Sequence, residues 1–203
     1  MEQGGALNPS LFTLHRIAYS IKEDRNDMAT WNSRGLRGST LEDMINKTNE
    51  KYRENGLALI QKIPTPITPI KMEPETRHIT LAYFEQKSTV DYIGAVQGIP
   101  VCFDAKECNT DTFPLANIHE HQVEFMRCFE KQDGVAFILI SYTHRNEYYY
   151  LTFKKLTEFW DRAAEGGKSF RYEELEPAFF LPEVPGILVP YLNALQLDLN
   201  CRA

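Results

Sequence analysis

Residues 90–107 read VDYIGAVQGIPVCFDAKE, and this stretch decides the fold of the chain. Its two apolar halves are separated by Gln97-Gly98, which is typical of a tight two-residue hairpin turn. We therefore expect two neighbouring strands. Side chains alternate between the faces of a strand, so Asp104 and Lys106 project to the same side, and Asp91 on the partner strand can reach that side too. The sequence thus predicts two carboxylates and one ammonium group together on one face.

Two carboxylates and a lysine on adjacent strands form a plausible hydrolytic site. Carboxylates are hard oxygen ligands for Mg²⁺, and a lysine can stabilise charge that develops on a phosphate. Thr89, two residues before Asp91, lies on the same face and adds another oxygen ligand. The alternative is an ordinary surface ion pair on an exposed strand edge. The apolar neighbours Val101 and Phe103 favour a site, because unpaired charges in such surroundings are costly.

The rest of the chain alternates helices and strands around this hairpin. Leu41, Ile45, Thr48 and Tyr52 recur at helical spacing after the candidate caps Ser39 and Thr40. This alternation indicates an α/β fold with a mixed central sheet flanked by helices. The expected elements are a helix from Ser39 that ends at Gly56, strands at 56–63, 135–140 and 147–153, helices at 118–129 and 154–164, and an irregular tail at 179–190 that packs over the body.

The segment Pro64-Thr65-Pro66-Ile67-Thr68-Pro69 interrupts this alternation. Three prolines remove backbone donors and fix φ, which excludes a central strand or a helix interior. We expect an extended protrusion at about residues 64–80 that returns through Lys71 and Arg77.

Length and composition indicate one folded domain, at 38–203, after a weakly ordered arm at 1–37. The chain has 203 residues, of which 43% are hydrophobic and 25% charged. Its net charge is -6, but residues 1–80 hold 11 Lys and Arg against 10 Asp and Glu. A DNA-binding surface is therefore expected to draw on the first half. The four cysteines are scattered, which predicts reduced thiols. The sequence shows no leader pattern and no apolar stretch long enough to span a membrane, so we expect a cytoplasmic location and no membrane association.

The pattern of Asp91 followed by Asp104-Ala105-Lys106 resembles the PD-(D/E)xK nuclease motif, and the surroundings resemble RecU-type Holliday junction resolvases over about residues 38–160. Several spaced blocks carry the resemblance. They are Gly38-Ser39-Thr40-Leu41-Glu42-Asp43-Met44-Ile45-Asn46, Tyr52, Pro64-Thr65-Pro66, Lys71, Arg77, Ala82-Tyr83-Phe84, Ser88-Thr89-Val90-Asp91-Tyr92-Ile93-Gly94, Phe103-Asp104-Ala105-Lys106-Glu107, Phe113-Pro114-Leu115 and His119-Glu120-His121-Gln122.

The resemblance implies a restriction-endonuclease-like fold and a set of site residues. By resemblance, Mg²⁺ or Mn²⁺ would be held at Thr89, Asp91, Asp104 and Gln122, and Lys106 would be the motif lysine. It also implies a symmetric homodimer and a role for the proline-rich protrusion as a stalk that enters the centre of a four-way junction. The chain departs from the family at Asp104, where Glu is usual, and at Val90, where Thr is common.

Some residues have more than one interpretation. Glu42 could join the catalytic site, or it could form a capping box with Ser39. His119 and His121 could join cysteines in a zinc site, but no pair has the usual ligand spacing. We interpret both histidines instead as helix N-terminal groups near phosphate or satisfied by the backbone. The tyrosines at 148–150 could stack on bases, but strand alternation favours the core, and we assign them no function.

The sequence thus predicts a metal-dependent endonuclease that resolves four-way junctions in DNA recombination and repair. Arg37, Lys71 and Arg77 are the expected DNA contacts. One rival is a non-catalytic DNA- or protein-binding relative of the fold, and another is a nuclease that cuts linear duplex DNA. Cleavage of a synthetic junction compared with cleavage of a duplex would separate the three.

Overall fold

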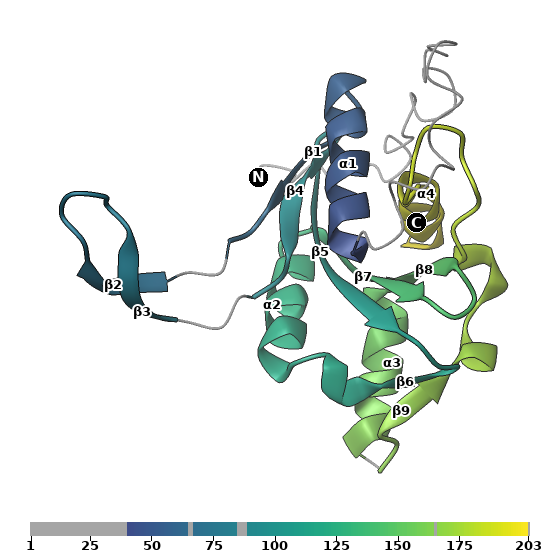
Figure 1. Ribbon diagram of the computed structural model, residues 1–203. Coiled ribbons are helices and arrows are strands. Elements are labelled where there is room, and N and C mark those ends of the chain that lie inside the picture. Colours follow the sequence, from purple (N-terminus) through teal and green to yellow (C-terminus); the bar gives the residue numbers. More distant parts are fainter. Residues whose placement is uncertain (1–39, 65–66, 85–88, 165, 203) are drawn as a thin grey trace, which may run out of the picture.

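The computed structural model describes residues 40–64, 67–84, 89–164 and 166–202 (Figure 1). The expected arm at 1–37, with Arg37, and the candidate cap Ser39 lie outside these ranges. The helices are α1 (Leu41–Glu54), α2 (Glu120–Glu130), α3 (Phe153–Ala164) and α4 (Leu192–Arg202), with short 3₁₀ turns at Leu115–Asn117, Tyr172–Glu174 and Pro177–Phe179. The strands are β1 (Leu59–Lys62), β2 (Ile67–Met72), β3 (Ile79–Phe84), β4 (Tyr92–Val96), β5 (Ile99–Cys108), β6 (Thr112–Pro114), β7 (Val135–Tyr142), β8 (Glu147–Thr152) and β9 (Ser169–Arg171).

The central sheet is mixed, as predicted. Its five strands lie in the order β1-β4-β5-β7-β8, and β5 and β7 run parallel while the other neighbours are antiparallel. The turn between β4 and β5 falls at Gln97 and Gly98, with φ of 48° and 91°. Positive φ at both positions is what a type I′ turn requires, so the predicted two-residue hairpin is confirmed.

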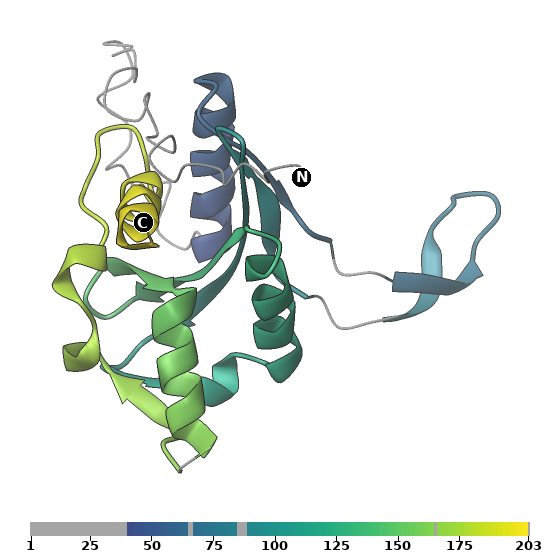
Figure 2. The same cartoon turned by 180° about the vertical axis from the view of Figure 1, so that it is seen from behind.

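Helices cover both faces of this sheet. The α1 backbone at Leu41 donates to Glu107 of β5, whereas Gln122 of α2 contacts Asp104, whose side chain leaves β5 on the other face. In Figures 1 and 2, α1 and α4 lie on one side of the sheet and α3 on the other. Alternate residues of β5 therefore face different helices: Glu107 faces α1, and Asp104 faces α2.

One face of the sheet carries a row of stacked aromatic rings. Tyr92, Phe103, Phe137 and Tyr150 come from four adjacent strands, with successive ring centroids 4.7, 4.7 and 4.3 Å apart. Tyr191 packs against this row, and its hydroxyl donates to Asn49 of α1 at 2.6 Å. Tyr92 directly follows Asp91, and Phe103 directly precedes Asp104. The packing of the row therefore holds in place the strands that carry both carboxylates.

Helix α1 forms as its pattern predicts, and of the two candidate caps, Ser39 and Thr40, it is Thr40 that precedes the helix. Leu41, Ile45 and Tyr52 are buried on one stripe, and Thr40 is the N-cap, whose hydroxyl accepts from the backbone of Asp43 at 3.3 Å. Helix α4 was not predicted. Leu192 and Leu195 are buried one turn apart, but the buried Asp198 follows on the same face, so no strong apolar period stands out in the sequence.

Residues 67–84 form a hairpin separate from the central sheet. Within the described residues, β2 and β3 pair with each other and with no further strand, and Figure 1 shows them standing clear of the body. The hairpin continues to Phe84, beyond the expected end of the protrusion near residue 80. No helix in the described part of the chain has both the length and the apolarity to cross a bilayer.

Candidate active site

Asp91 and Asp104 lie side by side at the end of the β4–β5 ladder. Asp91 comes just before β4, and its Oδ2 accepts a hydrogen bond of 2.9 Å from the backbone of Ala105. Asp104 lies within β5 and is fully buried. The two carboxylates are close enough for each to act on the other's charge. The predicted meeting of these side chains on one face is therefore what the hairpin produces.

Lys106 belongs to the same cluster. Its Nζ lies 2.5 Å from Asp104 Oδ2, and 19% of its side chain is exposed. That contact is an ion pair without hydrogen-bond geometry, because Oδ2 accepts no directed hydrogen bond. Asp104 thus keeps one buried carboxylate oxygen that only a cation balances.

The pKa of the Asp104 carboxyl lies near neutral pH. Burial raises the pKa of its carboxyl from 3.8 to about 7, the Lys106 ammonium opposes that rise, and the Asp91 charge adds to it. Opposed influences of this size are common where a site must bind a cation or move a proton. A divalent cation beside Oδ2 would favour the ionised form, because opposite charge lowers the pKa of a carboxyl.

Gln122 connects the start of α2 to this cluster. Its Nε2 donates to Asp104 Oδ1 at 2.9 Å, and its Oε1 accepts from the backbone of His119 at 3.1 Å. The side chain is buried, so both ends of the amide are held. In this arrangement Gln122 orients Asp104, and its own oxygen faces the helix start.

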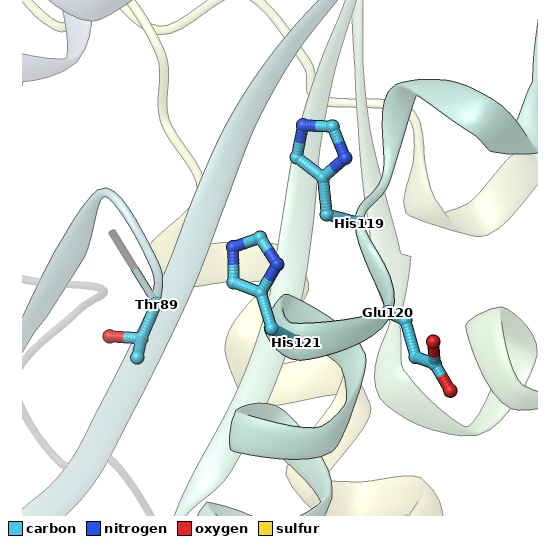
Figure 3. Close-up of a pocket in the computed structure, with 4 residues that line it drawn as sticks. All are labelled: Thr89, His119, Glu120 and His121. Carbon is cyan, nitrogen blue, oxygen red and sulfur yellow. The ribbon is translucent and has the colours of Figure 1, made fainter. Parts of the chain in front are cut away.

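Thr89 lies next to the same helix start. Together with His119, Glu120 and His121 it lines an open pocket of about 500 Å³. Figure 3 shows Thr89 on the strand side of this pocket and both imidazoles rising from the beginning of α2. The structure therefore brings Thr89, Asp91, Asp104, Lys106 and Gln122 into one region, with Thr89 just before β4 and Gln122 on α2.

Glu42 lies elsewhere. Its carboxylate forms an ion pair with Lys62 of β1, and its backbone carbonyl accepts from the Tyr92 hydroxyl at 3.2 Å. Tyr92 pairs with Phe103 in register, so this contact is on the sheet face opposite Asp104. Thr40 is the N-cap of α1, and the capping box considered for Glu42 involves Ser39, which lies outside the described residues. The partner Lys62 had not been singled out in the sequence, because nothing in a linear pattern pairs positions 20 residues apart.

The DNA-binding candidates fall on the hairpin or outside the described residues. Lys71 lies on β2, and Arg77 lies in the connecting loop with φ of 58°, a left-handed conformation uncommon for arginine. Both side chains are exposed. The hairpin that carries them stands clear of the body that holds Asp104 (Figure 1).

The residues present fit a magnesium-type ion. Mg²⁺ binds through one or two carboxylates and keeps several of its waters, and Asp104 Oδ2 is buried without a directed donor. Among the described residues, no three His, Cys, Asp or Glu side chains converge on one point. Cys102 and Cys108 are the cysteines that a zinc site with His119 and His121 would need; both are buried, and Cys108 Sγ donates to the carbonyl of Thr110 at 3.1 Å.

Comparison with known proteins finds a matching family and similar chains. The model of the family described as Recombination protein U (RecU) matches residues 36–197. A protein named Holliday junction resolvase RecU from Leuconostoc mesenteroides is 41% identical over 166 residues, which is 79% of this chain and 81% of that protein. Proteins of the same name from Levilactobacillus brevis (40% over 167 residues, 79% and 83%) and Bacillus subtilis (43% over 145 residues, 69% and 69%) are also similar.

Proposed function

The chain belongs to the Recombination protein U family, and on that premise we propose that it is an endonuclease that resolves four-way (Holliday) DNA junctions in recombination and repair. The observation that carries the proposal is the buried Asp104, flanked by Asp91 and Lys106, inside the region that the family model covers. A DNA substrate supports the expected cytoplasmic location.

The proposed cofactor is Mg²⁺ or Mn²⁺. Asp91 and Asp104 would hold the ion, with Thr89 and Gln122 completing or orienting its surroundings. When bound, such an ion polarises a phosphodiester and lowers the pKa of a water molecule for attack on phosphorus. Asp104 Oδ2 supports this assignment, because it is buried and accepts no directed hydrogen bond, so a cation must balance it: the Lys106 ammonium does so here, and a divalent ion would do so when bound.

Lys106 has a separate task. Its ammonium group is one ion-pair distance from Asp104, so it lies where charge would accumulate on the phosphate in the transition state. Gln122 keeps Asp104 in one orientation through its hydrogen bond. Both side chains are mostly shielded from water, which strengthens their electrostatic effect.

We also propose a symmetric homodimer with the hairpin 67–84 as the stalk that enters the junction. The hairpin exposes large apolar side chains, and a lone two-stranded hairpin is only marginally stable in water. A second copy would cover part of this surface, while Lys71 and Arg77 would remain for phosphates. The exposed side chains are Ile67, Ile70, Met72, Ile79, Leu81 and Tyr83.

The test is cleavage of a synthetic four-way junction in Mg²⁺ or Mn²⁺, beside a linear duplex of the same sequence. We expect paired symmetrical nicks in the junction and little cutting of the duplex. A protein that shifts the junction in a gel without nicking it in either metal would be a binding relative, and one that cuts both substrates equally would be a general nuclease. Either result contradicts the proposal.

A further inference from the structure

The pocket beside the carboxylates is lined by two histidines that the reaction described above does not use. His119 is exposed and His121 is half-buried, so neither ring serves to fill the core. Their rings are stacked, with centroids 5.4 Å apart and planes inclined by 13°. Figure 3 shows the His121 ring between His119 and Thr89, and the Glu120 carboxylate directed away from both rings.

Two hydrogen bonds through Gln122 connect this pocket to Asp104. The backbone of His119 donates to Gln122 Oε1 at 3.1 Å, and Gln122 Nε2 donates to Asp104 Oδ1 at 2.9 Å. On the opposite wall, Thr89 is two residues from Asp91. The pocket therefore borders the carboxylates on two sides of its wall, so a DNA strand whose scissile phosphate lies at the carboxylates can continue across it.

We propose that His119 and His121 bind the DNA phosphate next to the scissile one and so position the strand for cleavage; this rests on the proposed nuclease function. An imidazole carries an N–H donor whichever tautomer it adopts, and phosphate oxygens are strong acceptors. Because the two rings are nearly parallel, one phosphate group can meet a donor from each. The neighbouring carboxylate of Glu120 would repel that phosphate, and it is turned away.

The pocket suits a sugar-phosphate backbone better than it suits a base. It is open, and polar side chains line it, whereas a base is held between apolar or aromatic surfaces on its two faces. Phosphate contacts fix the register of a nucleic acid without reading its sequence. The histidines would accordingly decide where the strand lies relative to Asp104, and not which sequence is cut.

The first experiment measures binding without cleavage. The full chain with Asp91→Asn binds a fluorescent four-way junction at one fixed salt concentration, alone and with His119→Ala and His121→Ala added. We expect the two alanines together to weaken binding by about ten-fold or more, since hydrogen bonds to charged groups contribute this much. Glu120→Gln, on the same turn of helix, should weaken nothing. The backbone hydrogen bond from residue 119 to Gln122 survives both alanines.

The second experiment identifies the contacted group. Junctions that carry a single neutral methylphosphonate near the cleavage point are tested one position at a time. At one position next to the scissile phosphate, the neutral group should weaken binding to the protein with both histidines and cost the double alanine variant nothing further. His121→Gln, which keeps an N–H donor, should recover part of the affinity.

The outcomes separate the two proposals. If the alanine variant remains as sensitive as its parent to every methylphosphonate, or if abasic sites and not methylphosphonates erase the difference, the phosphate assignment is wrong. If the unsubstituted chain neither binds nor cuts the junction, the proposed function itself fails. Equal binding with and without the two alanines in the Asp91→Asn background, together with equal single-turnover cleavage with and without them when Asp91 is intact, would overturn this inference alone.

Discussion

Gln122 Nε2 donates a hydrogen bond of 2.9 Å to Asp104 Oδ1, which joins the first turn of α2 to the middle of β5. We expect Gln122→Ala to lower both cleavage and Mg²⁺ affinity by roughly 10- to 100-fold, the usual cost of losing a group that orients a metal ligand. Gln132→Ala, at an exposed position just after the same helix, is the control. A variant with normal cleavage and normal metal affinity would show that Asp104 needs no such support.

The carboxylates themselves should be indispensable for cleavage and dispensable for binding. Asp91→Asn or Asp104→Asn removes charge from the proposed metal site and leaves Lys71 and Arg77 unchanged. We expect cleavage to be lost and the junction affinity in a gel shift to stay within a few-fold. Asp133→Asn, on an exposed turn, should do neither. Substantial cutting by both variants in Mg²⁺ would remove these residues from the site.

Lys106→Ala should reduce cleavage by about 10²–10³, as expected when one electrostatic group of the transition state is lost. Since the Lys106 ammonium lowers the pKa of Asp104, its removal should raise that pKa further, and the cleavage defect should be smaller at alkaline pH. Lys155→Ala, which ends an exposed ion pair with Glu158, is the matched control. Normal turnover of the Lys106 variant at neutral pH would exclude the lysine from the mechanism.

Asp104 should also destabilise the metal-free protein at alkaline pH. Its pKa in the folded protein, about 7, lies above the ordinary 3.8, so the folded state takes up a proton that the unfolded chain releases. That contribution to stability is present at low pH and is lost as pH rises through 7. In chelator, we expect Asp104→Asn to increase the free energy of unfolding at about pH 8 by roughly 1–3 kcal/mol relative to its effect at about pH 5. Equal effects in urea unfolding at both values would refute a raised pKa.

Replacing residues 67–84 by a short Gly-Ser turn should spare the body and remove junction selectivity. The hairpin pairs within itself, so its loss takes no strand from the central sheet. We expect unchanged thermal unfolding of the body, less dimer by light scattering, and similar affinity for junction and duplex at one salt concentration. Lys71→Ala with Arg77→Ala separates the two effects, since it should weaken junction binding and leave the dimer intact. An unchanged preference for the junction in the deletion would rule out the stalk.

The sequence predicts most of the sheet because local rules act there. The Gln97-Gly98 turn and strand alternation are enough to place Asp104 and Lys106 on one face. The pairing of Glu42 with Lys62 is different, since it depends on how α1 lies across β1. Helix α4 could not be predicted for a similar reason. Its buried face carries Asp198 beside Leu192 and Leu195, and its polar contacts, Asp198 with Tyr150 and Arg202 with Glu130, are to residues far away in the sequence.

The length of the Gln97-Gly98 turn limits which insertions and deletions this gene can accept. The turn fixes which residue of β5 lies opposite Asp91, and neighbouring residues on a strand face opposite ways. Inserting or deleting one residue there would carry Asp104 into the aromatic row and turn Phe103 or Ala105 toward the DNA. Evolution can therefore alter the identity of residues in this turn, with glycine favoured at 98 by its positive φ, far more freely than it can alter their number.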